Sequence, residues 1–249
     1  VNFEAIQMAT NVDDLNRLVV EPASVALAEK INSDGLALYK AIPTTRGTAG
    51  TTPSGLSDFA AARLALNKAD APLTLRRAVW DPDADAAFTQ IGNLVKVSES
   101  GTASALREGE IGRVFGLDNY MSQAVKKHTT GATGTVLVDG AVTAGATQIH
   151  VDGLTTAFIV GDVFTIADDT TQYVVTKAGA ISTADQDIDI YPALQANAAD
   201  NKAITVVGTH TANLVFHENA FAFVSRPLIA PTDKESYTIQ TASAQPLKE

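Results

Sequence analysis

The sequence predicts an α+β protein in which a small antiparallel β-barrel is inserted into a mixed core of helices and strands. Three observations lead to this expectation. Apolar residues recur at helical spacing in the first part of the chain, and their period changes to two from Gly134. Residues 128–212 contain nine acidic and two basic residues, whereas residues 1–127 contain 15 and 13. Such a change of composition at both ends of a segment is typical of an inserted domain.

These observations divide the chain into three parts. We expect residues 1–133 to form the first part of the core, residues 134–209 to form the acidic barrel, and residues 210–249 to form strands that return to the core. A chain of 249 residues can bury enough surface for such a core without disulfides or metal ions.

The first expected element is one long helix. Thr10 or Asn11 would cap it, and Asp13 would lie in its first turn near the positive end of the helix dipole. Pro22 would either kink this helix or begin a second one. The apolar pattern continues to Pro43, and we expect its side chains to pack in the core.

Shorter elements are expected next. Residues 43–55 are rich in Gly, Pro, Ser and Thr and predict a loop. A second helix would follow with Ser57 as its N-cap, ending near Asp70. Residues 73–80 predict a strand, and a short helix would run from about residue 83 to residue 91.

The segment after Gly134 predicts a barrel or sandwich, because regular short strands alternate there with turn residues. Strand-like runs follow at 214–217 and 221–224. The two flanks of the insert, Tyr120–Val125 and Leu214–His217, could pair directly if the insert were absent. An insert whose ends lie close together costs its host little, and we expect residues 134–209 to fold alone. The strands of the insert are marked by six apolar pairs: Val136/Val138, Ile149/Val151, Phe164/Ile166, Tyr173/Val175, Ile188/Ile190 and Ile204/Val206.

Composition excludes several classes of protein. The chain has no cysteine, so disulfides, thiolate metal sites and cysteine nucleophiles are absent. No apolar run is long enough for a transmembrane helix, and the net charge of −10 argues against dedicated nucleic-acid recognition. The first residues show no signal peptide. Because Val1 is not an initiator methionine, we expect the encoded chain to be longer or to be trimmed by a maturation protease, which intact mass spectrometry would test.

The four histidines give no support for a metal site. None has the spacing of a zinc motif. His150 alternates with apolar neighbours, which places it on the outer face of a strand. His128 and His210 lie at the two edges of the acidic segment and indicate hinge regions, while His217 lies in the strand-like run at 214–217.

Two aspartate runs start like calcium loops but do not continue as such. Asp81–Asp85 matches the first three ligand positions of an EF-hand, yet the sixth position is Ala86 and the twelfth is Gly92. Asp185–Asp189 has Ala196 at its twelfth position. We interpret the runs as a helix N-terminus and a solvated strand face.

The glycine-rich segments 47–50 and 109–116 lack the lysine of a phosphate loop, and there is no nucleophile elbow or Ser/His/Asp set. We therefore predict no catalytic residue, no cofactor-binding residue and no metal ligand, and we expect no cofactor and no enzymatic activity. Gly109, Gly112 and Gly116 are expected to need a positive φ or to lie close to another chain.

Two stretches carry a resemblance to a known family. Leu106–Val125 contains a Gly-x-Ile-x-x-x-x-Gly segment, and Asn213–Leu228 contains Asn-Leu-x-Phe, Ala-Phe-Ala and Arg-Pro-Leu. Together they resemble the major capsid proteins of tailed bacteriophages, in particular the coat proteins of the P-twenty-two type. The resemblance extends from about residue 12 to residue 228 and includes Val19–Ile31 as the long spine helix. Further matches are Leu56–Ala69 as the next helix, Val79–Pro82 as a strand and turn, and 134–209 as the inserted barrel.

The resemblance implies an HK-ninety-seven-like capsid fold and a coat protein that self-assembles into hexamers and pentamers of an icosahedral shell around the phage double-stranded DNA. It implies copies of the chain as the main partners, portal and scaffolding proteins during assembly, non-specific contact with packaged DNA and no membrane. The protein would assemble in the bacterial cytoplasm and reside in the virion. The N-terminal arm and extended loop of the family are not found here. Two alternatives are another phage structural protein, of the tail or a decoration, and a β-rich hydrolase with aspartate pairs.

Overall fold

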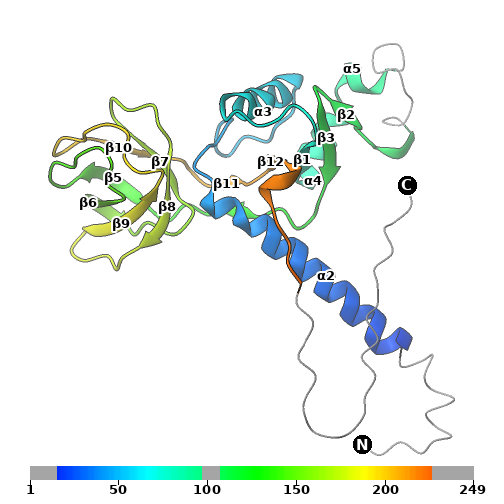
Figure 1. Ribbon diagram of the computed structural model, residues 1–249, viewed down its shortest axis with the longest axis horizontal. Helices are drawn as coiled ribbons and strands as arrows, with labels where there is room; N and C mark the ends of the chain where they lie inside the picture. Colours follow the sequence, from blue (N-terminus) through cyan, green and yellow to red (C-terminus); the bar gives the residue numbers. More distant parts are fainter. Residues whose placement is uncertain (1–15, 97–106, 226–249) are drawn as a thin grey trace, which may run out of the picture.

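The computed structural model describes residues 16–96 and 107–225. It is a mixed helix and strand protein with a six-stranded sheet, a four-stranded sheet and a two-stranded ribbon (Figure 1). A barrel-like sheet lies at one end, a smaller mixed sheet lies beside it, and a long helix runs away from both. The expected cap at Thr10 or Asn11 and the end of the Arg-Pro-Leu passage lie outside the described residues.

The long helix lies on the surface. A π-helical turn, η1 (Asn16–Val20), leads into α2 (Glu21–Leu36), and the 3-10 turn η2 (Ala37–Ala41) follows. Pro22 lies in the first turn of α2, where its missing N–H costs no hydrogen bond. The expectation that the apolar side chains of this helix pack in a core is wrong for this chain, because Leu36 is the one buried residue of α2.

The second helix, α3 (Leu56–Lys68), begins earlier than expected. Its N-cap is Gly55 rather than Ser57. The carboxylate of Asp58 accepts hydrogen bonds from the backbone N–H groups of Ser54 at 2.8 Å and Gly55 at 3.0 Å. This acidic side chain therefore satisfies the free donors at the start of the helix and sets where it begins. The preceding loop has no helix or strand, as predicted.

The mixed sheet has the order β12-β1-β3-β2. Its central strand, β1, pairs in parallel with β3 and antiparallel with β12. In the complete chain the flanks of the insert do not pair with each other, because β1 lies between β3 and β12. Direct pairing in the absence of the insert stays a prediction. Residues 221–224 form no strand, so that expectation is wrong as well. The bounds of the strands are β1 (Arg76–Trp80), β2 (Arg113–Val114), β3 (Leu117–Met121) and β12 (Leu214–His217).

An aromatic cluster joins this sheet to its helices. Between β1 and β2 lie α4 (Pro82–Phe88) and α5 (Gly92–Val95). Phe59 of α3, Trp80 of β1 and Phe88 of α4 are buried with ring centroids 4.3–5.3 Å apart. Aromatic pairs at this spacing add about 0.5–1.5 kcal/mol each beyond the area that they bury.

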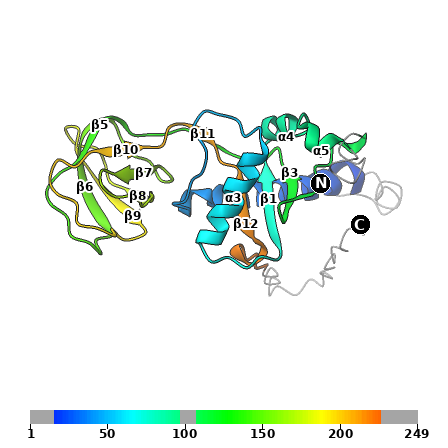
Figure 2. The same cartoon turned by 90° about the horizontal axis from the view of Figure 1, so that it is seen from above.

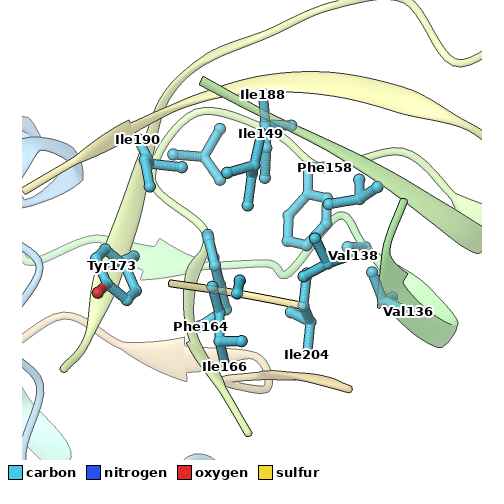
Figure 3. Close-up of a cluster of buried hydrophobic side chains, with 14 of the residues drawn as sticks. Val136, Val138, Ile149, Phe158, Phe164, Ile166, Tyr173, Ile188, Ile190 and Ile204 are labelled. Carbon is cyan, nitrogen blue, oxygen red and sulfur yellow. The ribbon is translucent and has the colours of Figure 1, made fainter. Parts of the chain in front are cut away.

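The second sheet closes into a barrel. Its strand order is β10-β7-β8-β9-β6-β5, and backbone hydrogen bonds between Val138 and residues 201 and 202 connect the two ends. All six predicted apolar pairs lie in these strands, and their side chains are buried except Val206, which is half-buried (Figure 3). The bounds are β5 (Thr133–Val138), β6 (Gln148–Thr156), β7 (Val163–Ile166), β8 (Tyr173–Ala178), β9 (Gln186–Tyr191) and β10 (Ile204–Val206).

A short ribbon connects the barrel to the rest of the chain. The strands β4 (Lys127–His128) and β11 (His210–Thr211) pair antiparallel, with His128 opposite His210. The chain enters the barrel after β4 and leaves it before β11, so these strands carry both connections. Past β12, the 3-10 turn η3 (Glu218–Ala220) is the last regular element among the described residues.

Candidate functional site

The structure separates the residues that the sequence singled out into surface groups and one buried network. Among residues 16–96 and 107–225, no group of three His, Cys, Asp or Glu side chains could hold a metal ion. Within the same ranges no helix has the length and apolar character needed to cross a membrane.

His150 lies on the outer face of β6, as its position in the sequence predicts. Its Nδ1 is 2.7 Å from Asp187 Oδ1, and its Nε2 is 3.2 Å from Asp139 Oδ2. The hydrogen bond to Asp187 raises the pKa of His150. Burial lowers this pKa, and the negative charges of Asp187, Asp139 and Asp185 raise it. All of these side chains are open to solvent, so the group is a surface ion cluster.

The aspartate runs are located as the sequence indicates. Asp187 and Asp189 point outward from β9 and alternate with buried Gln186 and Ile188. Asp81 is the N-cap residue of α4, which confirms the interpretation of its run as a helix N-terminus. These carboxylates therefore belong to solvated surfaces and to a helix start.

The glycine-rich segment before β3 forms a tight turn. Gly109, Gly112 and Gly116 all have positive φ, which confirms that part of the expectation. No atom lies within 4 Å of the position that a Cβ would occupy at any of them, so the subunit itself does not crowd them. Phe115 and Gly116, with φ of 49° and 82°, connect β2 to β3. A two-residue hairpin with positive φ at both positions is the type I′ turn.

A buried polar network connects the barrel, the ribbon and the end of the long helix. The Nε2 of His128 is 2.8 Å from Asp162 Oδ1, and its Nδ1 is 3.0 Å from the Tyr39 hydroxyl. His128 is 2% exposed and Asp162 is fully buried. Asp162 also accepts hydrogen bonds from the backbone N–H groups of residues 131, 132 and 159. Desolvation, followed by the charge of Asp162, raises the pKa of Tyr39, so its phenol remains a hydrogen-bond donor at neutral pH.

The sequence does not predict this network. His128 and His210 indicate a hinge, and the structure does place them opposite each other in the ribbon, with ring centroids 5.4 Å apart. The contact with Asp162 is between residues 34 positions apart, and the contact with Tyr39 is between residues 89 positions apart. No local spacing reports such contacts. The one signal is the glycine next to Asp162, which indicates a close approach of the backbone.

A second polar contact joins the same two parts of the chain. The backbone N–H of Thr45 donates to Gln172 Oε1 at 2.9 Å, and Gln172 Nε2 donates to Thr45 Oγ1 at 2.8 Å. A side chain at Gly161 would place its Cβ 2.8 Å from Lys40 Cγ and 3.3 Å from His128 Cε1. The barrel turn can therefore approach η2 because residue 161 has no side chain.

A group of exposed large apolar side chains lies along η1 and α2. We name this the α2 surface. Leu18 is 72% exposed and Leu27 is 62% exposed, and the other members are at least 41% exposed. These residues are distributed around the helix and alternate with polar ones such as Glu29 and the ion pair of Lys30 and Asp34. The α2 surface consists of Leu18, Val19, Val20, Val25, Leu27 and Ile31.

Comparisons with known proteins find little. No protein-family model matches the chain, and no curated protein matches it. A solved structure described as "Mycobacterium phage Che8" is similar with 18% sequence identity and a TM-score of 0.36. The match covers 83% of this chain and 67% of that chain. With a TM-score this low, the similarity carries no conclusion about function.

Proposed function

We propose that this chain is a self-assembling shell subunit, the major capsid protein of a tailed bacteriophage with an HK-ninety-seven-like fold. In this proposal the chain forms hexamers and pentamers of an icosahedral shell around double-stranded DNA and resides in the virion. The observation that carries the proposal is the α2 surface. Its apolar side chains lie on one long helix and stay exposed among the described residues.

The α2 surface exposes six large apolar side chains on one helix. Surface helices of single domains keep a polar face toward water, and exposed apolar patches mark contacts with other molecules. Full burial of a Val, Leu or Ile side chain contributes about 1.5–3 kcal/mol, so the α2 surface, even allowing for partial burial, can stabilise a subunit contact by several kcal/mol. Contacts of this kind between unlike faces of identical chains generate closed rings.

The order of the elements supports the same proposal. The segment that resembles the spine helix, Val19–Ile31, overlaps α2. The segment that resembles the next helix corresponds to α3. Val79–Pro82 spans the end of β1 and the start of α4. The barrel occupies the position of the insertion, between the two stretches that carry the family resemblance. Portal and scaffolding proteins during assembly, and packaged DNA, are further proposed partners.

A non-enzymatic role is part of the proposal. The one His–Asp–Tyr network of the described chain is not arranged for catalysis, because His128 and Asp162 are closed to solvent. The alternative of a β-rich hydrolase has little support at the small cavity beside Asp168 and Asp169, because Lys202 pairs with Asp168 and the Tyr173 hydroxyl donates to Asp169. The alternative of a tail or decoration protein shares the phage context and is distinguished by the shape of the assembly.

Electron microscopy of the purified chain tests the proposal. We expect polyhedral shells or hexameric capsomers from the native chain. Leu27→Glu should abolish them, because a carboxylate would have to be buried at the contact. The substituted subunit should still fold, since Leu27 is largely exposed.

Ser33→Glu is the matched control, because it adds the same charge to the same helix without removing an apolar side chain. It should reduce assembly less than Leu27→Glu does. A native chain that remains monomeric at high concentration would contradict the proposal, and so would tubes in place of shells or hexameric capsomers.

A further inference from the structure

We propose that Tyr39, His128 and Asp162 form a latch that fixes the orientation of the barrel relative to α2. The latch joins three parts of the chain: Tyr39 lies in η2 at the end of the long helix, His128 lies in the ribbon, and Asp162 lies in a turn of the barrel. This inference concerns the single chain and does not depend on the proposed function.

The ribbon by itself leaves the orientation of the barrel undetermined. It contains two pairs of residues, and its two strands bond to each other. Thr130 extends this pairing through hydrogen bonds to Val207 O at 2.8 Å and Thr209 Oγ1 at 3.2 Å. These bonds hold the two connections together, but a bend or twist of the ribbon would preserve all of them. Figure 2 shows the barrel at one end of the molecule, joined to the rest by these narrow connections.

Contacts from the barrel to η2 and to the loop after it restrict such a motion. His128 bonds on one side to Asp162 of the barrel and on the other side to Tyr39 of η2. The assignment of protons is consistent: Asp162 is an acceptor, so Nε2 carries a proton and donates, and Nδ1 accepts from the phenol of Tyr39. The Tyr39 and His128 rings also make an edge contact, with centroids 5.5 Å apart and planes at 77°.

Burial makes this network expensive to open. A rotation of the barrel away from η2 would separate the buried Asp162 from its His128 donor or His128 from Tyr39. A buried polar group that loses its partner costs about 1–3 kcal/mol, and a charged group costs more. The bonds between Thr45 and Gln172 would break in the same motion, because they join the same two parts of the chain. Two separate polar contacts therefore define one orientation.

Groups that face His128 come from each neighbouring element. They are Tyr39 from η2, His210 from β11 and Asp162 from the barrel, while Lys40 lies against Gly161 beside it. Asp162 also accepts hydrogen bonds from barrel backbone N–H groups. Substitution of Asp162 would therefore disturb the barrel itself, and a clean test changes the residues on the other side of the latch.

The experiment measures the distance between two spin labels by double electron–electron resonance. The chain has no cysteine, so labels can be attached at Thr143→Cys on the barrel and Ala28→Cys on α2, both exposed positions. A large excess of unlabelled chain ensures that only pairs within one chain are measured. We expect a narrow distance distribution in the otherwise native chain.

Tyr39→Ala combined with Gln172→Ala should broaden this distribution several-fold. Tyr39→Phe alone, which keeps the ring contact with His128, should broaden it less. Gln148→Ala is the matched control, because this glutamine bonds to Asp189 within the barrel, and the distribution should stay narrow.

Two results would overturn the inference. A distribution that stays narrow when Tyr39 and Gln172 are both replaced would show that the ribbon alone sets the orientation. Loss of the dispersed barrel amide signals in the NMR spectrum of Tyr39→Ala would show that the network supports barrel folding rather than orientation.

Discussion

Arg76 tests how the mixed core is held together. Its side chain is 2% exposed, and its guanidinium donates three hydrogen bonds. Nε donates to Pro72 O at 2.6 Å, Nη1 to Asn67 Oδ1 at 2.7 Å and Nη2 to Ala71 O at 2.6 Å. These acceptors lie at the end of α3 and in the connection that follows it. The side chain therefore ties that connection to the central strand of the sheet.

Replacement of Arg76 by methionine should destabilise the core strongly. A hydrogen bond from a charged group contributes about 1.5–3 kcal/mol, so three of them contribute about 5–9 kcal/mol before compensation. Methionine, an apolar side chain of similar length, recovers part of this free energy, because no charge then has to be removed from water. We expect Arg76→Met to lower the free energy of unfolding by about 3–4 kcal/mol.

The neighbouring arginine is a control in the same strand. Arg77 bonds to Glu218 at 3.1 Å, and both side chains are more than 40% exposed. An exposed ion pair contributes about 0–1 kcal/mol, so Arg77→Met should lower the free energy of unfolding by no more than that. Urea unfolding followed by tryptophan fluorescence measures both variants. Trp80 is the single tryptophan of the chain and lies in the buried cluster of the mixed core, at the other end of β1 from Arg76, so its emission reports on that core.

Equal losses for Arg76→Met and Arg77→Met would refute the reasoning. Such a result would mean that the connection after α3 is held by its own packing rather than by the buried guanidinium. A large loss for Arg76→Met without a change in the urea dependence of the unfolding free energy would confirm that the native state, and not the unfolded state, is affected.

Three other predictions concern the turn, the barrel and its surface. Gly116→Val should block assembly into shells more than it lowers solubility, because a side chain at φ of 82° costs about 1–2 kcal/mol and reshapes the exposed turn that holds Phe115. Sedimentation measures solubility and microscopy measures assembly. Normal shells would contradict the prediction. Residues 131–208, expressed alone, should give dispersed amide signals in an NMR spectrum, since the apolar core of the barrel is contributed by residues within this range; a random-coil spectrum would show that the barrel needs the rest of the chain. The pKa of His150 is raised in the folded chain, so the ion cluster stabilises the barrel below the ordinary histidine pKa, and this stabilisation is lost as the pH rises through the folded pKa. An NMR titration should show that Asp187→Asn returns the pKa of His150 toward its ordinary value, and an unchanged titration would contradict the assignment.

The barrel could be predicted because its information is local. Each apolar pair, such as Ile188 and Ile190, has a period of two that points both side chains to the same face of a strand. The outward position of His150 and Asp187 follows from the same alternation. Positive φ at Gly116 was also predictable, since glycine is the residue that adopts it at the least cost.

The long helix shows where the same reasoning fails. Helical spacing predicts that residues such as Leu27 and Ile31 lie in a helix, and they do. It does not tell whether the partner of their apolar side chains is the same chain or another one. The start of α3 was missed by two residues, because a carboxylate at Asp58 caps the helix from inside it.

The sequence alone determined the elements that depend on periodicity and on backbone preference: the helices α2 and α3, the strands of the barrel and the positive φ of Gly109, Gly112 and Gly116. Only the tertiary structure decided which elements are neighbours. It placed β1 between the two flanks of the insert, left the α2 surface exposed among the described residues, and brought Tyr39 and Asp162 to the two sides of His128. The physical reason is that periodicity records which face of an element is apolar, whereas long-range contacts depend on how the whole chain closes around its cores.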